Sequence, residues 1–103
     1  MSRLEELTER MKTAVGTDAG LGKTLKFNLK GEGFVFIDGR SVSNEDKPAD
    51  LTLSVTIDDL KAIGQGKLSP MFAMMSGRLG VSDVGVAIGL QSKMKELFSK
   101  MPA

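Results

Sequence analysis

The feature that most constrains this fold is a strict alternation of apolar and polar residues that leads directly into a turn. In residues 25–29, Leu, Phe and Leu occupy every second position, with Lys and Asn between them. A period of two predicts a strand with one buried face. The Gly31-Glu32 pair then predicts a two-residue hairpin loop into a second strand over 34–37.

The expected loop length sets the register of this hairpin and decides which side chains share a face. The cross-strand pairs predicted for one face are Leu29 with Phe34 and Phe27 with Phe36. Val35 and Ile37 would then lie on the opposite face. We therefore expect this second strand to be covered on both sides or to lie centrally in the sheet.

The rest of the chain alternates between strand and helix spacing. Asp38-Gly39 predicts a tight turn into a third strand over 40–43, and a fourth strand is expected over 50–56. A short last strand is expected around Leu79 and Val81. Hairpins and segregated helices together favour an α+β domain, in which helices cover one face of a five-stranded, mostly antiparallel sheet.

Four helices are expected. The first begins at a Ser2 capping box and ends at Gly16, and its apolar stripe is Leu4, Leu7, Met11, Ala14 and Val15. The second begins at Thr56, and a short third helix over 71–76 follows a Ser-Pro pair typical of a helix start. The last begins near Val84, and its stripe is Ala87, Leu90, Met94, Leu97 and Met101.

A length of 103 residues favours one domain spanning residues 1–103. The chain has 14 basic and 13 acidic side chains and a formal net charge of +1. A charge this close to zero gives no reason to expect a nucleic acid as partner. The chain contains no His and no Cys. Imidazole and thiol catalysis, disulfides and ordinary zinc sites are thereby excluded, so we expect neither an enzyme nor a cofactor.

The sequence carries no sign of a targeting segment. No apolar run approaches the roughly 20 residues that span a bilayer. The charged residues 1–12 do not have the apolar centre of a signal peptide, and the last three residues are not a peroxisomal Ser-Lys-Leu address. We therefore expect a cytoplasmic location.

Two patterns resemble functional motifs but have simpler interpretations. Residues 20–24 read Gly-Leu-Gly-Lys-Thr, yet the preceding strand and the full glycine spacing of a phosphate loop are absent. Asp58 and Asp59 are adjacent and face apart on a helix. They are typical of a helix start rather than of a metal site.

Methionine is concentrated in one segment. The chain has seven Met, and three of them lie with Phe72 in the short helix expected over 71–76. A helix that is apolar all round is expected to be buried on most sides. Flexible Met side chains suit adaptable apolar surfaces, and the alternative interpretation is ordinary filling of the core.

The last helix carries residues whose roles are open. Gly85 and Gly89 lie four residues apart and hence on one face. They either permit close approach of another backbone or leave room for a guest molecule. Gln91 is either an exposed helical residue or a polar anchor in an apolar pocket, a common design for small-molecule sites.

Several short fragments form an ordered set along the chain. They are Ala49-Asp50 before the alternating strand, Gly66-Lys67-Leu68-Ser69-Pro70, Ala73-Met74, Gly77-Arg78-Leu79 and Leu90-Gln91. In this order and spacing the chain resembles the lipid-binding domain of the sterol carrier protein type 2 family. It lacks the Trp often found in the family's second strand and the peroxisomal tail, so it resembles a free-standing, bacterial-like member.

The resemblance implies an apolar tunnel between sheet and helices that accepts a fatty acid, fatty acyl-CoA, phospholipid or sterol-like lipid. It implies a carrier that transfers or presents lipids and is not itself an enzyme. The residues expected to contact the ligand are Phe34 and Phe36 from the strand pattern, Ile88 and Met94 from the last helix, and Met71, Met74, Met75 and Gln91 from positions that match the family.

A second interpretation stays open. The same fold would also serve as an interaction or accessory domain that docks on a lipid-metabolising enzyme without a stable guest. The exposure expected for Val35 and Ile37 motivates this interpretation. The expected partners are therefore an apolar lipid, a membrane that is visited transiently and an enzyme of lipid metabolism.

Overall fold

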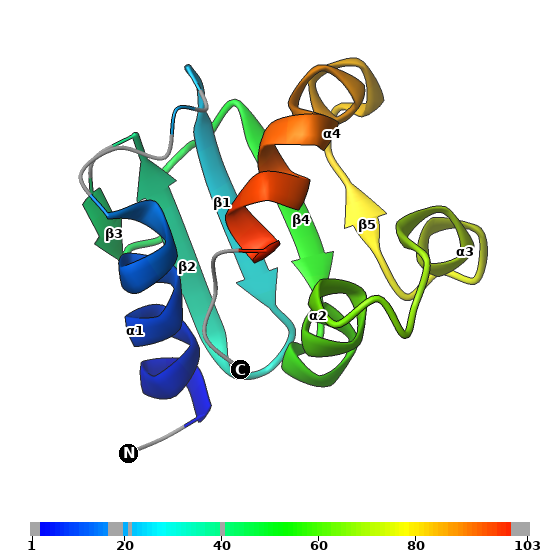
Figure 1. Ribbon diagram of the computed structural model, residues 1–103, viewed down its shortest axis with the longest axis horizontal. Coiled ribbons are helices and arrows are strands. Elements are labelled where there is room, and N and C mark those ends of the chain that lie inside the picture. The colour runs from blue at the N-terminus through cyan, green and yellow to red at the C-terminus, as the bar shows by residue number, and fades with distance from the viewer. Residues whose placement is uncertain (1–2, 17–19, 21, 40, 100–103) are drawn as a thin grey trace.

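The described part of the chain, residues 3–16, 20, 22–39 and 41–99 of the computed structural model, forms one sheet with helices at its front (Figure 1). The strands are β1 (Thr24–Leu29), β2 (Gly33–Asp38), β3 (Ser41–Ser43), β4 (Leu51–Val55) and β5 (Gly80–Val81). The helices are α1 (Arg3–Val15), α2 (Ile57–Gly64), α3 (Pro70–Met75) and α4 (Val84–Ser99). The expected elements also included Ser2, Arg40 and Met101, which lie outside the described residues.

The strand order explains how the helices are placed. The five strands of the described chain lie in the order β3-β2-β1-β4-β5. Neighbours are antiparallel except for β1 and β4, which are parallel. Helices α1, α2 and α4 cover the front face in Figure 1, and α3 lies beyond the β5 edge. The expected α+β fold with a mostly antiparallel sheet is confirmed.

The front face of the central strands carries the core. Phe27 lies in the middle of β1 and is fully buried. The apolar stripe expected on the first helix packs on this face, where Leu7 and Met11 are buried. Leu90 and Leu97 of α4 complete the layer. None of the described helices has the length and apolarity needed to cross a bilayer.

The β1–β2 hairpin differs from the expected register. Leu29 pairs with Gly33, so the loop has three residues, 30–32, instead of two. The Glu32 N–H donates to the Leu29 carbonyl oxygen at 2.7 Å. Gly31 adopts a φ of 80°, a conformation that favours glycine. Because side chains alternate along a strand, one additional loop residue moves every side chain of β2 to the other face.

The shifted register corrects the expectation for four side chains. Val35 and Ile37 face the helices and are fully buried, so the prediction that they lie away from the buried face of β1 is wrong. Phe34 and Phe36 lie on the back of the sheet instead. The feature that motivated an interaction surface on β2 is therefore absent.

The connection between β3 and β4 covers part of the back of the sheet. β3 and β4 point in the same direction, so residues 44–50 return across β2 and β1. Lys47 Nζ lies 5.7 Å from the centroid of the Phe36 ring, and Lys26 Nζ lies 2.7 Å from Asp46 Oδ1. This connection explains why Phe36 is only 6% exposed although it faces away from the helices.

Asp50 joins the starts of the two parallel strands. Its Oδ2 accepts hydrogen bonds from the Thr24 backbone N–H at 2.9 Å and from Thr24 Oγ1 at 3.2 Å. The Asp50 N–H donates to Thr24 Oγ1 at 2.8 Å. The first pair of the parallel ladder, Leu25 with Leu51, follows directly. The backbone donor and then the hydroxyl donor of Thr24 lower the pKa of the Asp50 carboxyl.

We expect Asp50→Asn to reduce the free energy of unfolding at neutral pH and to have a smaller effect in acid. Since the pKa of Asp50 is lowered in the folded state, its carboxylate stabilises the fold above the unfolded value of 3.8. This contribution is lost as the pH falls through the folded pKa. Urea unfolding of wild type and variant across this pH range measures the difference.

The isosteric variant Thr24→Val provides the control for this titration. It removes the hydroxyl donor and keeps the backbone donor, so the pKa of Asp50 should rise part of the way toward 3.8. Carboxyl carbon shifts in an NMR titration report this value. A wild-type pKa for Asp50 at or above 3.8 would contradict the assignment.

Two helices begin at a hydroxyl residue, but their caps differ. Thr56 Oγ1 accepts the Asp59 N–H at 3.1 Å at the start of α2. Ser69 makes no side-chain capping bond at the described start of α3. We expect Thr56→Ala to lower the free energy of unfolding by about 1 kcal/mol and Ser69→Ala to have a clearly smaller effect. Denaturant unfolding of both variants measures this, and equal losses would show that the Thr56 bond does not cap.

Candidate functional site

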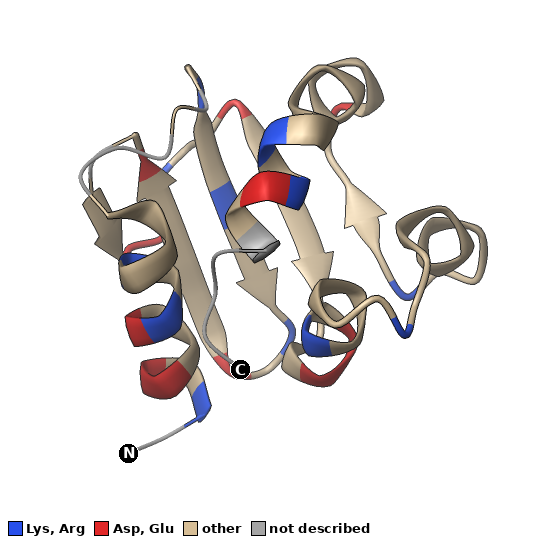
Figure 2. Cartoon of the chain, in the orientation of Figure 1, with Lys and Arg blue, Asp and Glu red and all other residues tan. Residues whose placement is uncertain are grey.

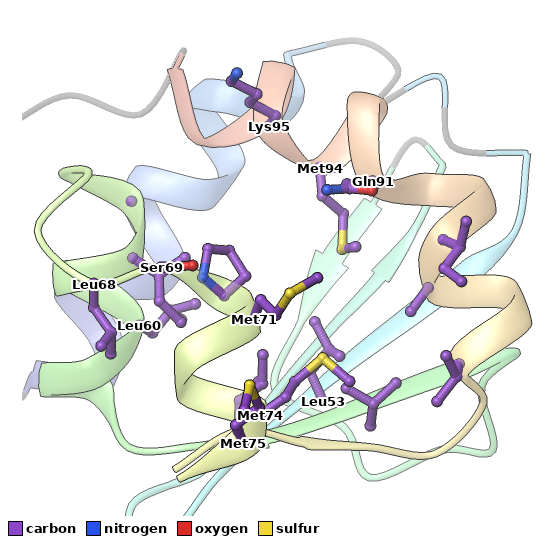
Figure 3. A pocket seen from close by; sticks show the side chains of 18 of the residues that line it. Leu53, Leu60, Leu68, Ser69, Met71, Met74, Met75, Gln91, Met94 and Lys95 are labelled. Carbon is purple, nitrogen blue, oxygen red and sulfur yellow. The ribbon is translucent and has the colours of Figure 1, made fainter. Parts of the chain in front are cut away.

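An open apolar pocket lies between α2, α3 and α4, above the β4–β5 end of the sheet (Figure 3). Its volume is about 750 Å³. Its floor comes from the sheet, and its walls come from the three helices and from the loop that joins α2 to α3. Most of the lining side chains are aliphatic or Met.

The floor of the pocket is an extension of the core. Leu53 of β4 pairs with Val81 of β5, and both side chains line the pocket. Leu60 and Ile63 of α2 form the adjoining wall. The sequence shows these residues as ordinary apolar positions of a strand and a helix. Nothing in their spacing distinguishes a pocket wall from a closed core, so they were not expected as site residues.

The short helix α3 forms the outer wall of the pocket. Met71, Met74 and Met75 line the pocket, yet Met71 is 72% exposed and Met75 is 83% exposed. Within α3, Ala73 is the buried side chain. The expectation that this apolar helix is buried on most sides is therefore wrong. The helix stands beside an open space and not inside a closed core.

Turns at both ends hold α3 in this position. Before the helix, the N–H groups of Lys67 and Leu68 donate to the Ala62 carbonyl oxygen at 2.8 and 3.2 Å. After the helix, the N–H groups of Arg78 and Leu79 donate to the Ala73 carbonyl oxygen at 2.8 and 3.0 Å. These bonds fix the backbone of α3 although few of its side chains are buried.

Helix α4 forms the opposite wall. Ile88, Gln91 and Met94 all line the pocket, and Ile88 is 68% exposed. Figure 3 shows Met94 and Gln91 projecting from the same stretch of α4. Gln91 is at once an exposed helical residue and a pocket residue, so the two interpretations left open by the sequence are not exclusive.

The two glycines of α4 serve neither of their expected purposes. A Cβ atom at Gly89 would meet no atom within 4 Å, and one at Gly85 would meet only Asp83 Oδ1 at 3.3 Å. No other backbone packs closely there among the described residues. Neither glycine lines the pocket, so they leave no room for a guest in it.

The structure brings six of the eight expected ligand residues to one pocket. These are Met71, Met74, Met75, Ile88, Gln91 and Met94. Phe34 and Phe36 lie on the back of the sheet, outside this pocket, because the hairpin loop is one residue longer than expected.

The few polar side chains that line the pocket are all exposed. Besides Gln91, the polar lining residues are Ser69 and Lys95, and no acidic side chain lines the pocket. Figure 3 shows the Lys95 Nζ directed away from the Met side chains. In the described residues, no group of three or more acidic side chains could hold a metal ion. The arrangement suits an apolar molecule with a polar or anionic end at the rim.

Comparison with known sequences agrees with this geometry. A sequence model of the SCP-2 sterol transfer family matches residues 3–95. Hydroxysteroid dehydrogenase-like protein 2 of Danio rerio is 38% identical, and the match covers 74% of this chain and 20% of that protein. The Bos taurus protein of the same name is 33% identical with the same coverage. This chain therefore spans about a fifth of the length of these curated relatives.

Solved structures share the fold. Sterol Carrier Protein 2 Like 2 of Aedes aegypti is 25% identical and has a TM-score of 0.71, with 85% of this chain and 93% of that chain covered. Sterol Carrier Protein 2 of Aedes aegypti, solved in complex with the C16 fatty acid palmitate, is 19% identical with a TM-score of 0.71. That match covers 99% of this chain and 100% of the other. With a family match over residues 3–95 and the same fold around the pocket, the chain belongs to the SCP-2 sterol transfer family.

Proposed function

We propose that the chain binds the apolar part of a lipid in the pocket and carries or presents that lipid. The observation that supports this is an open apolar pocket of about 750 Å³ whose own large side chains are exposed. Removing apolar surface from water contributes about 25 cal/mol per Å². A lipid chain would cover the exposed faces of Met71, Met75 and Ile88 and gain this free energy.

The proposed ligand class is a fatty acid, fatty acyl-CoA, phospholipid or sterol-like lipid. The solved relative that holds palmitate supports the first of these. Gln91 and Lys95 lie one helical turn apart on α4 and both line the pocket. In this proposal the amide and the ammonium group receive the polar end of the lipid at the rim. An enclosed tunnel stays a prediction, because this pocket is open.

The proposal is for a carrier rather than a catalyst. The sequence has no His and no Cys, the residues that most often act as base or nucleophile. The pocket lining also has no acidic side chain. A cytoplasmic location completes the proposal, since a carrier there would reach both membranes and the enzymes of lipid metabolism.

Lipid retention and thermal stability together test the proposed function. Native mass spectrometry of gently purified protein should show one bound lipid, and delipidated protein should melt at a higher temperature when palmitate or palmitoyl-CoA is added. Ligand at 100 times its Kd adds about 2.7 kcal/mol to the free energy of unfolding. The absence of both a retained lipid and a melting shift with any lipid class would refute the proposal.

A pair of substitutions on α3 locates the binding site. Met74→Gln keeps the length of the side chain and places an amide in the apolar lining, so palmitate affinity should fall roughly tenfold or more. Phe72→Gln introduces the same residue on the same helix, but Phe72 does not line the pocket and its change should leave palmitate affinity unaltered. Titration calorimetry measures both. Equal losses would place the lipid elsewhere.

A second candidate function has one observation in its favour. The chain covers only 20% of curated relatives whose names place them among dehydrogenase-like proteins. A domain of this kind would present a lipid to an enzyme instead of acting alone. Size-exclusion chromatography with light scattering distinguishes the two functions. A lipid-loaded monomer supports a free carrier. A stable complex between lipid-free protein and a co-purifying enzyme supports an accessory domain.

A further inference from the structure

The apolar surface of α3 extends beyond the pocket. Phe72 is 58% exposed and does not line the pocket. It lies three residues before Met75, so the two side chains share the outward edge of the helix. A ligand in the pocket would therefore leave Phe72 uncovered. Large apolar side chains exposed next to one another, such as Met71, Phe72 and Met75, are typical of interaction sites.

The charged side chains nearest to α3 in the sequence are basic, and the nearest acidic residues are Asp59 and Asp83. Residues 60–82 contain Lys61, Lys67 and Arg78 and no Asp or Glu. Lys67 and Arg78 are exposed, and neither takes part in an ion pair among the described residues. Figure 2 shows blue segments in the chain turns before and after α3, while the helix itself carries no charge.

We propose that α3, with Lys67 and Arg78 on its two flanks, docks on an anionic lipid surface and opens the pocket toward the bilayer. The two cations would contact lipid phosphates, and Phe72 and Met75 would enter the interfacial layer. This inference rests on the proposed lipid-binding function, because Met75 belongs both to the docking edge and to the pocket lining. A lipid chain would then pass between bilayer and pocket along the Met side chains without crossing water.

A second copy of the chain fits this surface poorly. α3 has six residues and is about 9 Å long, whereas stable interfaces bury roughly 1,200–2,000 Å². A two-fold dimer through α3 would also bring Lys67 and Arg78 of one copy against the same cations of the other. Anionic phosphates complement these charges, so the lipid surface is the occupant that the structure favours.

Vesicle flotation with charge-reversed variants tests this docking surface. Wild-type protein should bind vesicles of equimolar phosphatidylcholine and phosphatidylserine, bind phosphatidylcholine vesicles weakly and release in high salt. The double variant Lys67→Glu and Arg78→Glu should bind the anionic vesicles at least roughly 30-fold more weakly, since the loss of two cations alone corresponds to about 2 kcal/mol. The control is Arg10→Glu with Lys12→Glu on α1, which lies near the β3 edge of the sheet, whereas α3 lies beyond the β5 edge (Figure 1).

The control pair should keep wild-type vesicle binding. Loss of binding in the α1 pair, with full binding in the α3 pair, would overturn the proposal. Self-association of the wild type that is lost in the α3 pair would overturn it as well, in favour of a dimer surface.

Phe72→Gln distinguishes failure of this inference from failure of the proposed function. It should weaken vesicle binding roughly tenfold and leave the affinity for palmitate unchanged, since Phe72 does not line the pocket. Unchanged vesicle binding with intact palmitate binding would refute only the docking surface. Absence of palmitate binding in the wild type would refute the proposed function itself.

Discussion

The structure depends on how the apolar front face of one sheet is divided between tight packing and open space. Over β1 and β2, α1 and α4 exclude water and Phe27 is fully buried. Toward β5, the same face carries Leu53 and Val81, and the helices stand apart around about 750 Å³. Because burial stabilises in proportion to the area removed from water, the first half supplies stability that the second half lacks. The hydrogen bonds between Thr24 and Asp50 lie where the two halves join, at the start of the parallel pair β1–β4.

This division explains why an apolar helix remains exposed in a small domain. α3 contributes one buried side chain, Ala73, and its position depends on backbone hydrogen bonds at both ends. A helix of six residues has too little intrinsic stability to form alone. Its other apolar side chains add little to the core, so core packing does not explain why this helix is apolar. In this respect α3 contributes more to the pocket than to the core.

The sequence predicted the elements well because their periodicities are local, and it failed where the local pattern is compatible with two structures. The α1 stripe and the Thr56 cap depend on spacing within one helix. The pattern around Gly31, however, is compatible with a hairpin loop of two or of three residues. The loop has three, and this one-residue difference places Val35 in the core and Phe34 on the back of the sheet. The sequence identified the Met residues of α3 as site candidates, but it did not predict that their side chains are exposed. Composition does not distinguish a helix covered by its own chain from one covered by something outside it.

In the proposed carrier, the Met side chains of the exposed wall suit both the empty and the lipid-filled pocket. In water the empty pocket exposes Met71, Met74 and Met75, and each exposed apolar side chain reduces the stability gained on folding. Branched side chains of the same size are stiffer, so they would present the same surface in the empty and in the lipid-filled pocket. Met is unbranched and flexible, so in the proposed carrier the same side chains lie across the empty pocket or around a lipid of varying shape. The backbone of α3 can then stay fixed by its terminal hydrogen bonds while its side chains adapt, which favours broad over narrow ligand selectivity.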